Sequence, residues 1–201
     1  MATSGIARLV CSLHDIGAIK FGQFKLKDGR MSPVYVDLRV LVSHPDVLRQ
    51  VARAFLEAAK PLTFRRVSGI PYAGLPLAVA VSLEGGIPMV YARKEKHETG
   101  TARMVEGEYE QGDVVLLVDD VITSGQSKIE GIEPLEAHGL KVSDLLVLID
   151  REQGGKESVE GVGYKLHSVM TIREALEILR EEGRIAPALH DECVAFLGSR
   201  S

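Results

Sequence analysis

The sequence predicts an α/β fold in which helices flank a central parallel sheet. Short apolar strands alternate with helical patterns from about residue 66 onward, and the runs Val114–Val118 and Leu145–Ile149 are wholly apolar. Such runs are typical of a parallel sheet, because helices cover both of its faces. The 201 residues fit one domain with a sizeable core. With 45% hydrophobic and 26% charged residues, the composition excludes disordered and collagen-like classes.

The N-terminal region predicts a helix, a hairpin and a second helix. Apolar residues recur at helical spacing from Ile6 to Ile16. The segments Phe24–Lys27 and Pro33–Val36 flank Asp28-Gly29, a pair that tolerates the positive φ of a tight turn. Proline is accepted in the first turn of a helix, so Pro45 predicts the start of the next one.

The remaining segments predict further strands and helices in alternation. We expect strands at Val67–Ile70 and Pro88–Tyr91, and helices at Leu75–Leu83, at Ile129–Ala137 and from Thr171 to about Glu182. Glycines follow the first two helices, and Thr171 with Glu174 forms a capping box for the third.

Between Arg93 and Asp113 no period is apparent, and the segment is polar and contains three glycines. A connection of this length in a compact α/β domain is usually a functional lid or disordered. The charge run Arg93–Glu98 directly follows a predicted strand, which places it at the carboxyl edge of the sheet, where ligands bind in such folds.

The most specific motif is VVLLVDDVITSGQS, residues 114–127. An apolar strand leads into the two carboxylates Asp119 and Asp120, then into a small hydroxyl- and glycine-containing loop and a helix. The N–H groups of such a loop and helix start suit a phosphate dianion. Carboxylates accept hydrogen bonds from sugar hydroxyls. The motif therefore predicts a site for a phosphorylated sugar, whereas a simple helix cap would need one Asp only.

Residues 114–127 resemble the phosphoribosyl pyrophosphate (PRPP) fingerprint of the type I phosphoribosyltransferases. The runs 20–35, 69–77, 93–95 and 150–155 resemble, in family order, further segments of the orotate phosphoribosyltransferases. Within this family the motifs are more similar to those of the domain that is fused to orotidylate decarboxylase in animals. The resemblance implies a type I phosphoribosyltransferase fold as a single domain over residues 1–201. A small hood, from about residues 1–40 and the C-terminal strand end, and a mobile loop would complete this fold.

The resemblance implies transfer of 5-phosphoribosyl from PRPP to orotate, giving orotidine 5′-monophosphate and pyrophosphate in pyrimidine biosynthesis. It implies Mg²⁺ held mainly by PRPP and water, with Asp119 and Asp120 nearby and no direct protein ligand. The orotate site would comprise Lys27, Tyr35, Val36, Thr123 and Arg151, whose guanidinium can grip a carboxylate with two hydrogen bonds. The PRPP site would comprise Lys27, Tyr72, Arg93, Lys94, Asp119, Asp120, Val121, Ile122, Thr123, Ser124, Gly125, Gln126 and Ser127.

The loop departs from the family pattern after Arg93-Lys94-Glu95. Relatives carry their catalytic lysine where this chain has His97, and Lys96 stands one residue earlier. The candidate catalytic residues are thus Lys96 and His97 in this loop, together with Asp119 and Asp120 of the PRPP motif. Our hypothesis is that Lys96 neutralises the leaving pyrophosphate and His97 is secondary, because histidine is only partly charged near neutral pH.

Partners and location follow from charge and resemblance together. The net charge of −4 predicts no nucleic-acid partner, and no run is long and apolar enough for a membrane span. We expect a cytoplasmic chain with Cys11 and Cys193 reduced. The resemblance implies a homodimer whose loop acts in the neighbouring site. Two alternatives remain: a phosphoribosyltransferase for another base, and a non-catalytic PRPP sensor that binds RNA or DNA.

Overall fold

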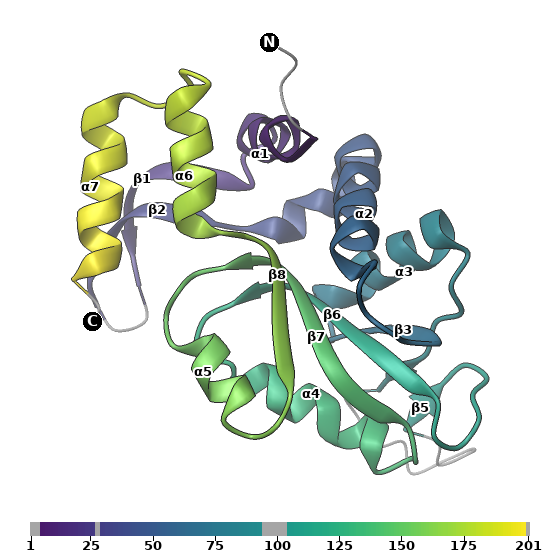
Figure 1. Cartoon of the computed structure of the whole chain (residues 1–201). Helices are drawn as coiled ribbons and strands as arrows, with labels where there is room; N and C mark the ends of the chain where they lie inside the picture. The colour runs from purple at the N-terminus through teal and green to yellow at the C-terminus, as the bar shows by residue number, and fades with distance from the viewer. Residues whose placement is uncertain (1–4, 27–28, 94–103, 200–201) are drawn as a thin grey trace.

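A four-stranded parallel sheet forms the centre of the molecule. The computed structural model describes residues 5–26, 29–93 and 104–199. The strands lie in the order β3 (Arg66–Gly69), β6 (Val114–Ile122), β7 (Lys141–Asp150) and β8 (Lys165–Thr171), and all neighbours are parallel (Figure 1). The predicted parallel α/β architecture is confirmed.

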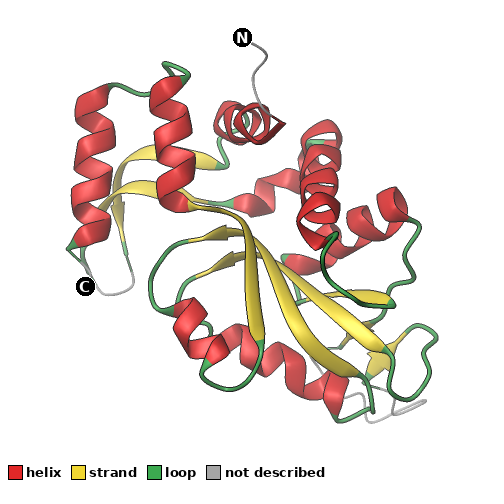
Figure 2. Ribbon diagram, in the orientation of Figure 1, coloured by secondary structure: helices red, strands yellow, loops and turns green. Residues whose placement is uncertain are grey.

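Helices cover both faces of this sheet (Figure 2). Alternate residues of a strand point to opposite faces, which is why β6 and β7 are apolar throughout. Leu116 and Leu146 pack with α2 (Pro45–Ala59) and α3 (Gly74–Gly85) in one core cluster. Leu117 and Leu145 belong to the other cluster, with apolar residues of α4 (Gln126–Glu136) and α5 (Gly155–Glu160).

A second layer, which we call the hood, lies beyond the carboxyl edge of the sheet. Its antiparallel strands β1 (Ile19–Lys25) and β2 (Met31–Val36) follow α1 (Gly5–Asp15) and are separate from the central sheet. The 3₁₀ helix η1 (Leu38–Ser43) leads back from β2 to α2. Helices α6 (Ile172–Glu181) and α7 (Pro187–Gly198) complete the hood, with α7 packed against β2 (Figure 1).

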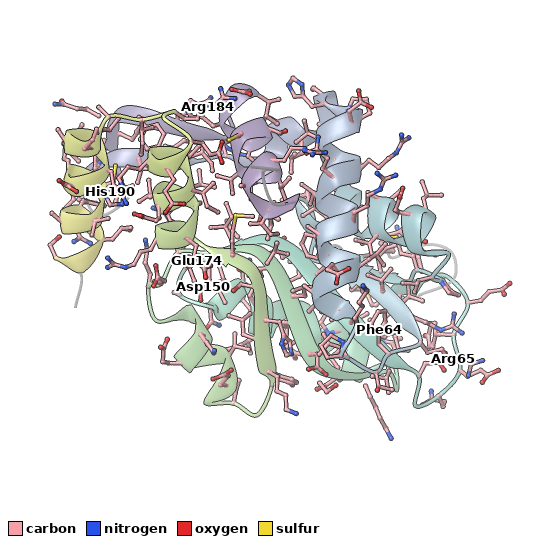
Figure 3. The ribbon with its side chains drawn as sticks, turned by 45° about the horizontal axis from the view of Figure 1, so that its top comes forward. Phe64, Arg65, Asp150, Glu174, Arg184 and His190 are labelled. Atoms are coloured by element: carbon pink, nitrogen blue, oxygen red, sulfur yellow. The ribbon has the colours of Figure 1, made fainter. Side chains whose placement is uncertain are left out.

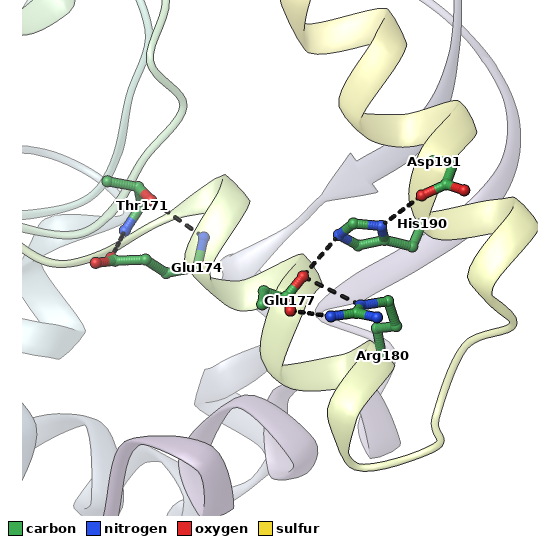
Figure 4. A network of polar contacts seen from close by, with 6 residues as sticks. All are labelled: Thr171, Glu174, Glu177, Arg180, His190 and Asp191. Carbon is green, nitrogen blue, oxygen red and sulfur yellow. Dashed lines mark hydrogen bonds and ion pairs between the residues drawn. The ribbon is translucent and has the colours of Figure 1, made fainter.

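Polar contacts fix α6 and its junction with α7 (Figure 4). The predicted capping box is present: Thr171 Oγ1 accepts from the Glu174 N–H at 3.2 Å, and Glu174 Oε2 accepts from the Thr171 N–H at 2.7 Å. His190 Nε2 on α7 lies 3.1 Å from Glu177 Oε2 on α6. This pair joins the C-terminal helix to the helix that leaves the central sheet.

One strand expected for the central sheet is wrong in detail. Pro88–Tyr91 does not form a strand of the central sheet, and makes only a single bridge there, between Met89 and Val67. Proline has no N–H to donate to a ladder, so pairing at this edge stops early. The chain turns away as β4 (Tyr91–Ala92), antiparallel to β5 (Val105–Glu106) within the segment where no period is apparent.

Strand β8 and helix α5 were not expected from the sequence. Polar residues His167 and Ser168 interrupt the apolar pattern of β8, and α5 is short. Within the described residues, no helix has the length and apolar character needed to cross a bilayer. The cysteines Cys11 and Cys193 are both free, as expected for reduced thiols.

Candidate active site

The two tandem carboxylates lie inside a strand rather than after one. The expected strand ended at Val118, but β6 continues to Ile122 because its pairing with β7 persists to Asp150. Alternation along the strand therefore sends Asp119 and Asp120 to opposite faces of the sheet. The two side chains enter different surroundings, which the motif alone does not reveal.

Asp119 faces α4 and is buried. Its carboxylate lies 2.5 Å from the ammonium of Lys128, and the two side chains are 6% and 7% exposed. Burial raises the pKa of Asp119 to about 6, and the charge of Asp120 acts in the same direction. The Lys128 ammonium opposes this shift, because it favours the ionised carboxylate.

Asp120 is half-buried on the other face. Its Oδ1 accepts a hydrogen bond from the Val121 N–H at 2.7 Å. Arg39 of η1 lies on this side: two of its nitrogens bind the Asp37 carboxylate at 2.7 and 3.0 Å. Its guanidinium is also within electrostatic range of Asp120 and Tyr35, and the pKa of Arg39 is raised, mainly by Asp37. Asp120 therefore faces the hood.

The loop after β6 presents backbone N–H groups. Gly125 caps α4 with a φ of 85°, a left-handed conformation that favours glycine, and its carbonyl accepts from the Lys128 N–H at 2.9 Å. The first N–H groups of a helix have no partner inside the helix. The loop Thr123–Gly125 and the start of α4 therefore have the geometry of a phosphate site.

A second loop, Arg151–Gly154 after β7, packs directly on the first. The Arg151 N–H donates to the Ile122 carbonyl at 3.1 Å. A Cβ added to Gly155 would lie 2.5 Å from the Thr123 carbonyl oxygen, and one added to Gly125 would lie 2.9 Å from the Gly155 carbonyl oxygen. Two glycines thus allow the loops that follow neighbouring strands to touch.

The loop after β7 has its own supports. Glu152 adopts a φ of 54°, uncommon for a residue with a side chain, and its N–H donates to Asp150 Oδ1 at 2.8 Å. Its carboxylate lies 3.3 Å from Arg173 on α6. Figure 3 shows Asp150 near Glu174, at the junction of the central sheet and α6. These contacts fix the backbone from which Arg151 projects.

A third loop, between β3 and α3, lies beside Asp119. The Ile70 N–H donates to the Val118 carbonyl at 3.1 Å, and the Gly74 N–H donates to the Ile70 carbonyl at 2.9 Å. A Cβ on Gly74 would come within 2.7 Å of the Val118 oxygen and 3.0 Å of Asp119 Oδ1. Three loops therefore converge at the carboxyl edge of the sheet, where α/β folds bind ligands.

The hood contributes an aromatic pair. Tyr35 on β2 stacks on Phe24 of β1 with ring centroids 5.3 Å apart and an interplanar angle of 28°. Val36 beside it is buried. Both rings are half-buried, so the hairpin presents a partly exposed aromatic pair.

A family model described as "Phosphoribosyl transferase domain" matches residues 41–165. The chain is 38% identical to orotate phosphoribosyltransferase of Pyrococcus abyssi over 171 residues, which cover 84% of this chain and 94% of the relative. The chain belongs to the orotate phosphoribosyltransferase family.

Longer relatives of this orotate phosphoribosyltransferase family member contain a similar segment. Uridine 5′-monophosphate synthase of Bos taurus is 45% identical over 182 residues, 90% of this chain but 38% of that protein. The solved structure of UMP synthase from Leishmania donovani matches with a TM-score of 0.88 at 37% identity, covering 96% of this chain and 42% of that one. The chain therefore spans about two fifths of the length of these two synthases.

The structure brings most of the predicted site residues to one edge of the sheet. Residues 119–127 run from the end of β6 through the loop Thr123–Gly125 to the start of α4, and Arg151 belongs to the loop that packs on them. Tyr35 and Val36 lie on the hood strand that leads to Arg39. Tyr72 is 67% exposed in the loop before α3. Arg93 pairs with Glu106 of β5 at 3.1 Å. The predicted residues Lys27, Lys94, Lys96 and His97 lie outside the described residues.

Two charged residues at the site were not anticipated, Lys128 and Arg39. Lys128 had a signal in the sequence: it precedes Ile132 and Leu135 by four and seven residues, a spacing that puts all three on the buried face of α4. A lysine on such a face needs a partner. Arg39 had no comparable signal, because its position depends on how η1 turns back toward β6.

Proposed function

We propose that this chain catalyses transfer of the 5-phosphoribosyl group from PRPP to orotate, forming orotidine 5′-monophosphate and pyrophosphate in pyrimidine biosynthesis. The observation that carries the proposal is the direct packing of the Arg151 loop on the Thr123–Gly125 loop, beside Asp119 and Asp120. A phosphate site, hydroxyl acceptors and a cation suited to a carboxylate are thereby joined at one edge. Family membership supports the same reading.

In the proposed PRPP site, the loop Thr123–Gly125 and the first residues of α4, Gln126 and Ser127, hold the 5′-phosphate through N–H and hydroxyl groups. Asp120, half-buried and facing the hood, accepts hydrogen bonds from the ribose hydroxyls. Tyr72, Arg93 and Lys94 meet the pyrophosphate. Glu106 pairs with Arg93 in the described structure, and the pyrophosphate would displace Glu106 from the Arg93 guanidinium.

In the proposed orotate site, Arg151 binds the carboxylate of the base through its guanidinium fork. Lys27, Thr123 and the backbone around Tyr35 and Val36 complete the site for the base. The cation favours an acidic base over a neutral purine. Residues 1–40 and the end of β7 together form the base-binding side of a single phosphoribosyltransferase domain.

The proposed reaction forms a bond from the orotate ring nitrogen to the anomeric carbon while the bond to pyrophosphate breaks, and the proton of that nitrogen passes to solvent. Positive charge develops on the ribose, and Asp120 and Asp119 stabilise it electrostatically. The tight packing of the three loops fixes the two substrates relative to each other. Mg²⁺ would be held mainly by PRPP and water, with Asp119 and Asp120 nearby and no direct protein ligand, and it would supply charge neutralisation on the pyrophosphate.

The segment that follows β4 supplies the remaining proposed cations. Its two ends are adjacent, because the Arg93 N–H donates to the Met104 carbonyl at 2.8 Å. Lys96, with His97 secondary, neutralises the leaving pyrophosphate in our proposal. Closure of this segment over the substrates would exclude water and limit hydrolysis of PRPP.

Orotidylate formation tests this function. The chain is incubated with PRPP and Mg²⁺ and with orotate, uracil, hypoxanthine or nicotinate as parallel acceptors, and product is followed chromatographically. Turnover with orotate alone is expected. Turnover with another base would reassign the acceptor, and PRPP binding without turnover on any base would favour the sensor alternative.

We also propose that two copies associate, each loop acting in the neighbouring site. Helix α3 is apolar around its circumference, yet Leu83 is 80% and Val79 46% exposed. A helix that is apolar on all sides is normally covered on all sides. Sedimentation of the wild type as a dimer and of Leu83→Glu as a monomer is expected; a monomeric wild type would refute the assembly. The free thiols fit the proposed location in the cytoplasm.

A further inference from the structure

A buried lysine lies directly beneath the tandem carboxylates. Lys128 is in the first turn of α4, its backbone N–H donates to the Gly125 carbonyl at 2.9 Å, and its side chain is 7% exposed. The ammonium ends 2.5 Å from Asp119 Oδ2. One residue thus touches both the phosphate loop and the first carboxylate, through its backbone and its side chain respectively.

This arrangement changes the charge of the site. PRPP is a polyanion, and two adjacent ionised carboxylates would oppose its approach. A buried ammonium at hydrogen-bond distance compensates one of them, so Asp119 and Lys128 together are neutral and Asp120 carries the remaining charge. A buried carboxylate without such a partner would take up a proton instead.

Among the described residues, few other charged groups lie near Asp119. On its own strand the neighbour is Asp120, and Lys128 comes from α4. The adjacent loop contributes Gly74, and the neighbouring strand β7 places Val147 beside it. Arg39 lies on the side of Asp120 and is engaged by Asp37. Lys128 is therefore the cation that determines the state of Asp119.

We propose that Lys128 is a positioning residue of the PRPP site. It holds Asp119 ionised and oriented, so that Asp119, Asp120 and Lys128 together carry one net negative charge when PRPP binds. This inference rests on the proposed function. In the reaction cycle Lys128 transfers no proton and forms no bond to substrate. It acts through Asp119 and through the start of α4.

The test compares Lys128→Met, which removes the charge while keeping the length, with Lys128→Arg, which keeps the charge. The measurement is kcat/KM for PRPP in orotidylate formation between about pH 5.5 and 9. An opposite charge at this range lowers a carboxyl pKa by one unit or more. In Lys128→Met the acid limb of the profile should therefore move up by about one pH unit or more. Because the pKa of Asp119 is about 6 with Lys128 present, activity at pH 7 should be about twofold lower if the limb moves by one pH unit and about tenfold lower if it moves by two, with recovery at alkaline pH. Lys128→Arg should keep the wild-type limb.

Lys141→Met is the matched control, because it removes an exposed lysine at the opposite end of the sheet. Lys128→Gln, which keeps a donor beside Asp119 without the charge, replaces Lys128→Met if that variant does not fold. A loss by the same factor at every pH, or an unshifted limb in the neutral variant, would overturn the proposal. PRPP binding to the wild type is also measured, by calorimetry. A wild type that binds PRPP but transfers no phosphoribose to orotate would refute the proposed function alone, which separates that failure from failure of the Lys128 proposal.

Discussion

At the scale of single residues, Asp119 and Asp120 differ more than their adjacency suggests. Asp119 is buried against Lys128, whereas Asp120 is half-buried and faces the hood. The sequence predicted both as sugar-binding carboxylates, because a motif records residue types and not the faces they occupy. The difference arises from the extension of β6 through both positions. Asp120 is consequently the residue whose loss should most directly affect the bound ribose.

The first prediction concerns the loop cations Lys96 and His97. If Lys96 neutralises the pyrophosphate, Lys96→Ala should lower kcat by about 10²-fold or more, the size expected for one preorganised charge. His97→Ala should have a smaller effect that grows below neutral pH, where histidine is charged. Steady-state kinetics of both variants give the answer. Full turnover in Lys96→Ala together with an inactive His97→Ala would reverse the assignment.

At the scale of elements, the sequence located most of the helices and the central strands β3, β6 and β7, but not β8, α5 or the junctions between elements. The capping box at Thr171 and the glycine after α3 marked helix ends correctly, because these signals are local. The contact of Gly125 with Gly155 could not be predicted, since it joins residues thirty positions apart through the register of β6 and β7. The same holds for the pairing of β4 with β5, which no local pattern indicated.

A glycine substitution tests the junction of the two loops. Gly155→Ala would place a Cβ 2.5 Å from the Thr123 oxygen and 2.6 Å from the Ile122 side chain. Such overpacking costs about 1–3 kcal/mol. We expect chemical denaturation to show this loss of stability, and KM to rise for both substrates, because the loop shifts at the site.

Gly198→Ala is the matched control for this substitution. Its added Cβ meets nothing within 4 Å, so neither stability nor kinetics should worsen. Equal behaviour of the two variants would show that the strand-end loops are not closely packed in solution.

At the scale of the whole molecule, the carboxyl edge of the central sheet carries the proposed site, whereas the amino edge carries an ion-pair cluster that joins strands. The carboxyl edge gathers the three loops of the site. At the amino edge, Asp113 before β6 lies 2.5 Å from Arg66 Nε on β3 and 3.1 Å from Arg65 (Figure 3, labelled Arg65). The Glu110 N–H also donates to Asp113 at 2.9 Å. This cluster joins β3 to β6 far from the proposed chemistry.

The amino-edge cluster predicts a pH-dependent part of the stability. The Glu110 N–H and the Arg66 guanidinium lower the pKa of Asp113 below its ordinary value of 3.8. A carboxyl whose pKa is lower in the folded state stabilises the fold above its ordinary pKa, and loses this effect as pH falls through the folded value. Asp113→Asn should therefore lower the urea midpoint at pH 7, with the difference from wild type shrinking below about pH 4. A difference that is constant with pH would contradict this origin. Orotidylate formation under native conditions should be unchanged.

The fold class and the family could be predicted from the sequence, because the alternation of apolar strands and the run 114–127 are contained in contiguous residues. The role of α7 could not, since it depends on the packing of α7 against β2, over a hundred and fifty residues away. Lys128 lies between these cases. Its spacing with Ile132 marked a buried lysine, but only the structure identifies Asp119 as its partner.

The central claim is that the carboxyl edge of β6 is the catalytic site for transfer of phosphoribose to orotate. The most direct measurement is the initial rate of orotidine 5′-monophosphate formation by the wild type and by Asp120→Asn, side by side at saturating PRPP and orotate. We expect turnover by the wild type and a decrease of about 10²-fold or more in the variant, as for loss of a group that stabilises developing charge. An active wild type with an equally active Asp120→Asn would place the chemistry elsewhere.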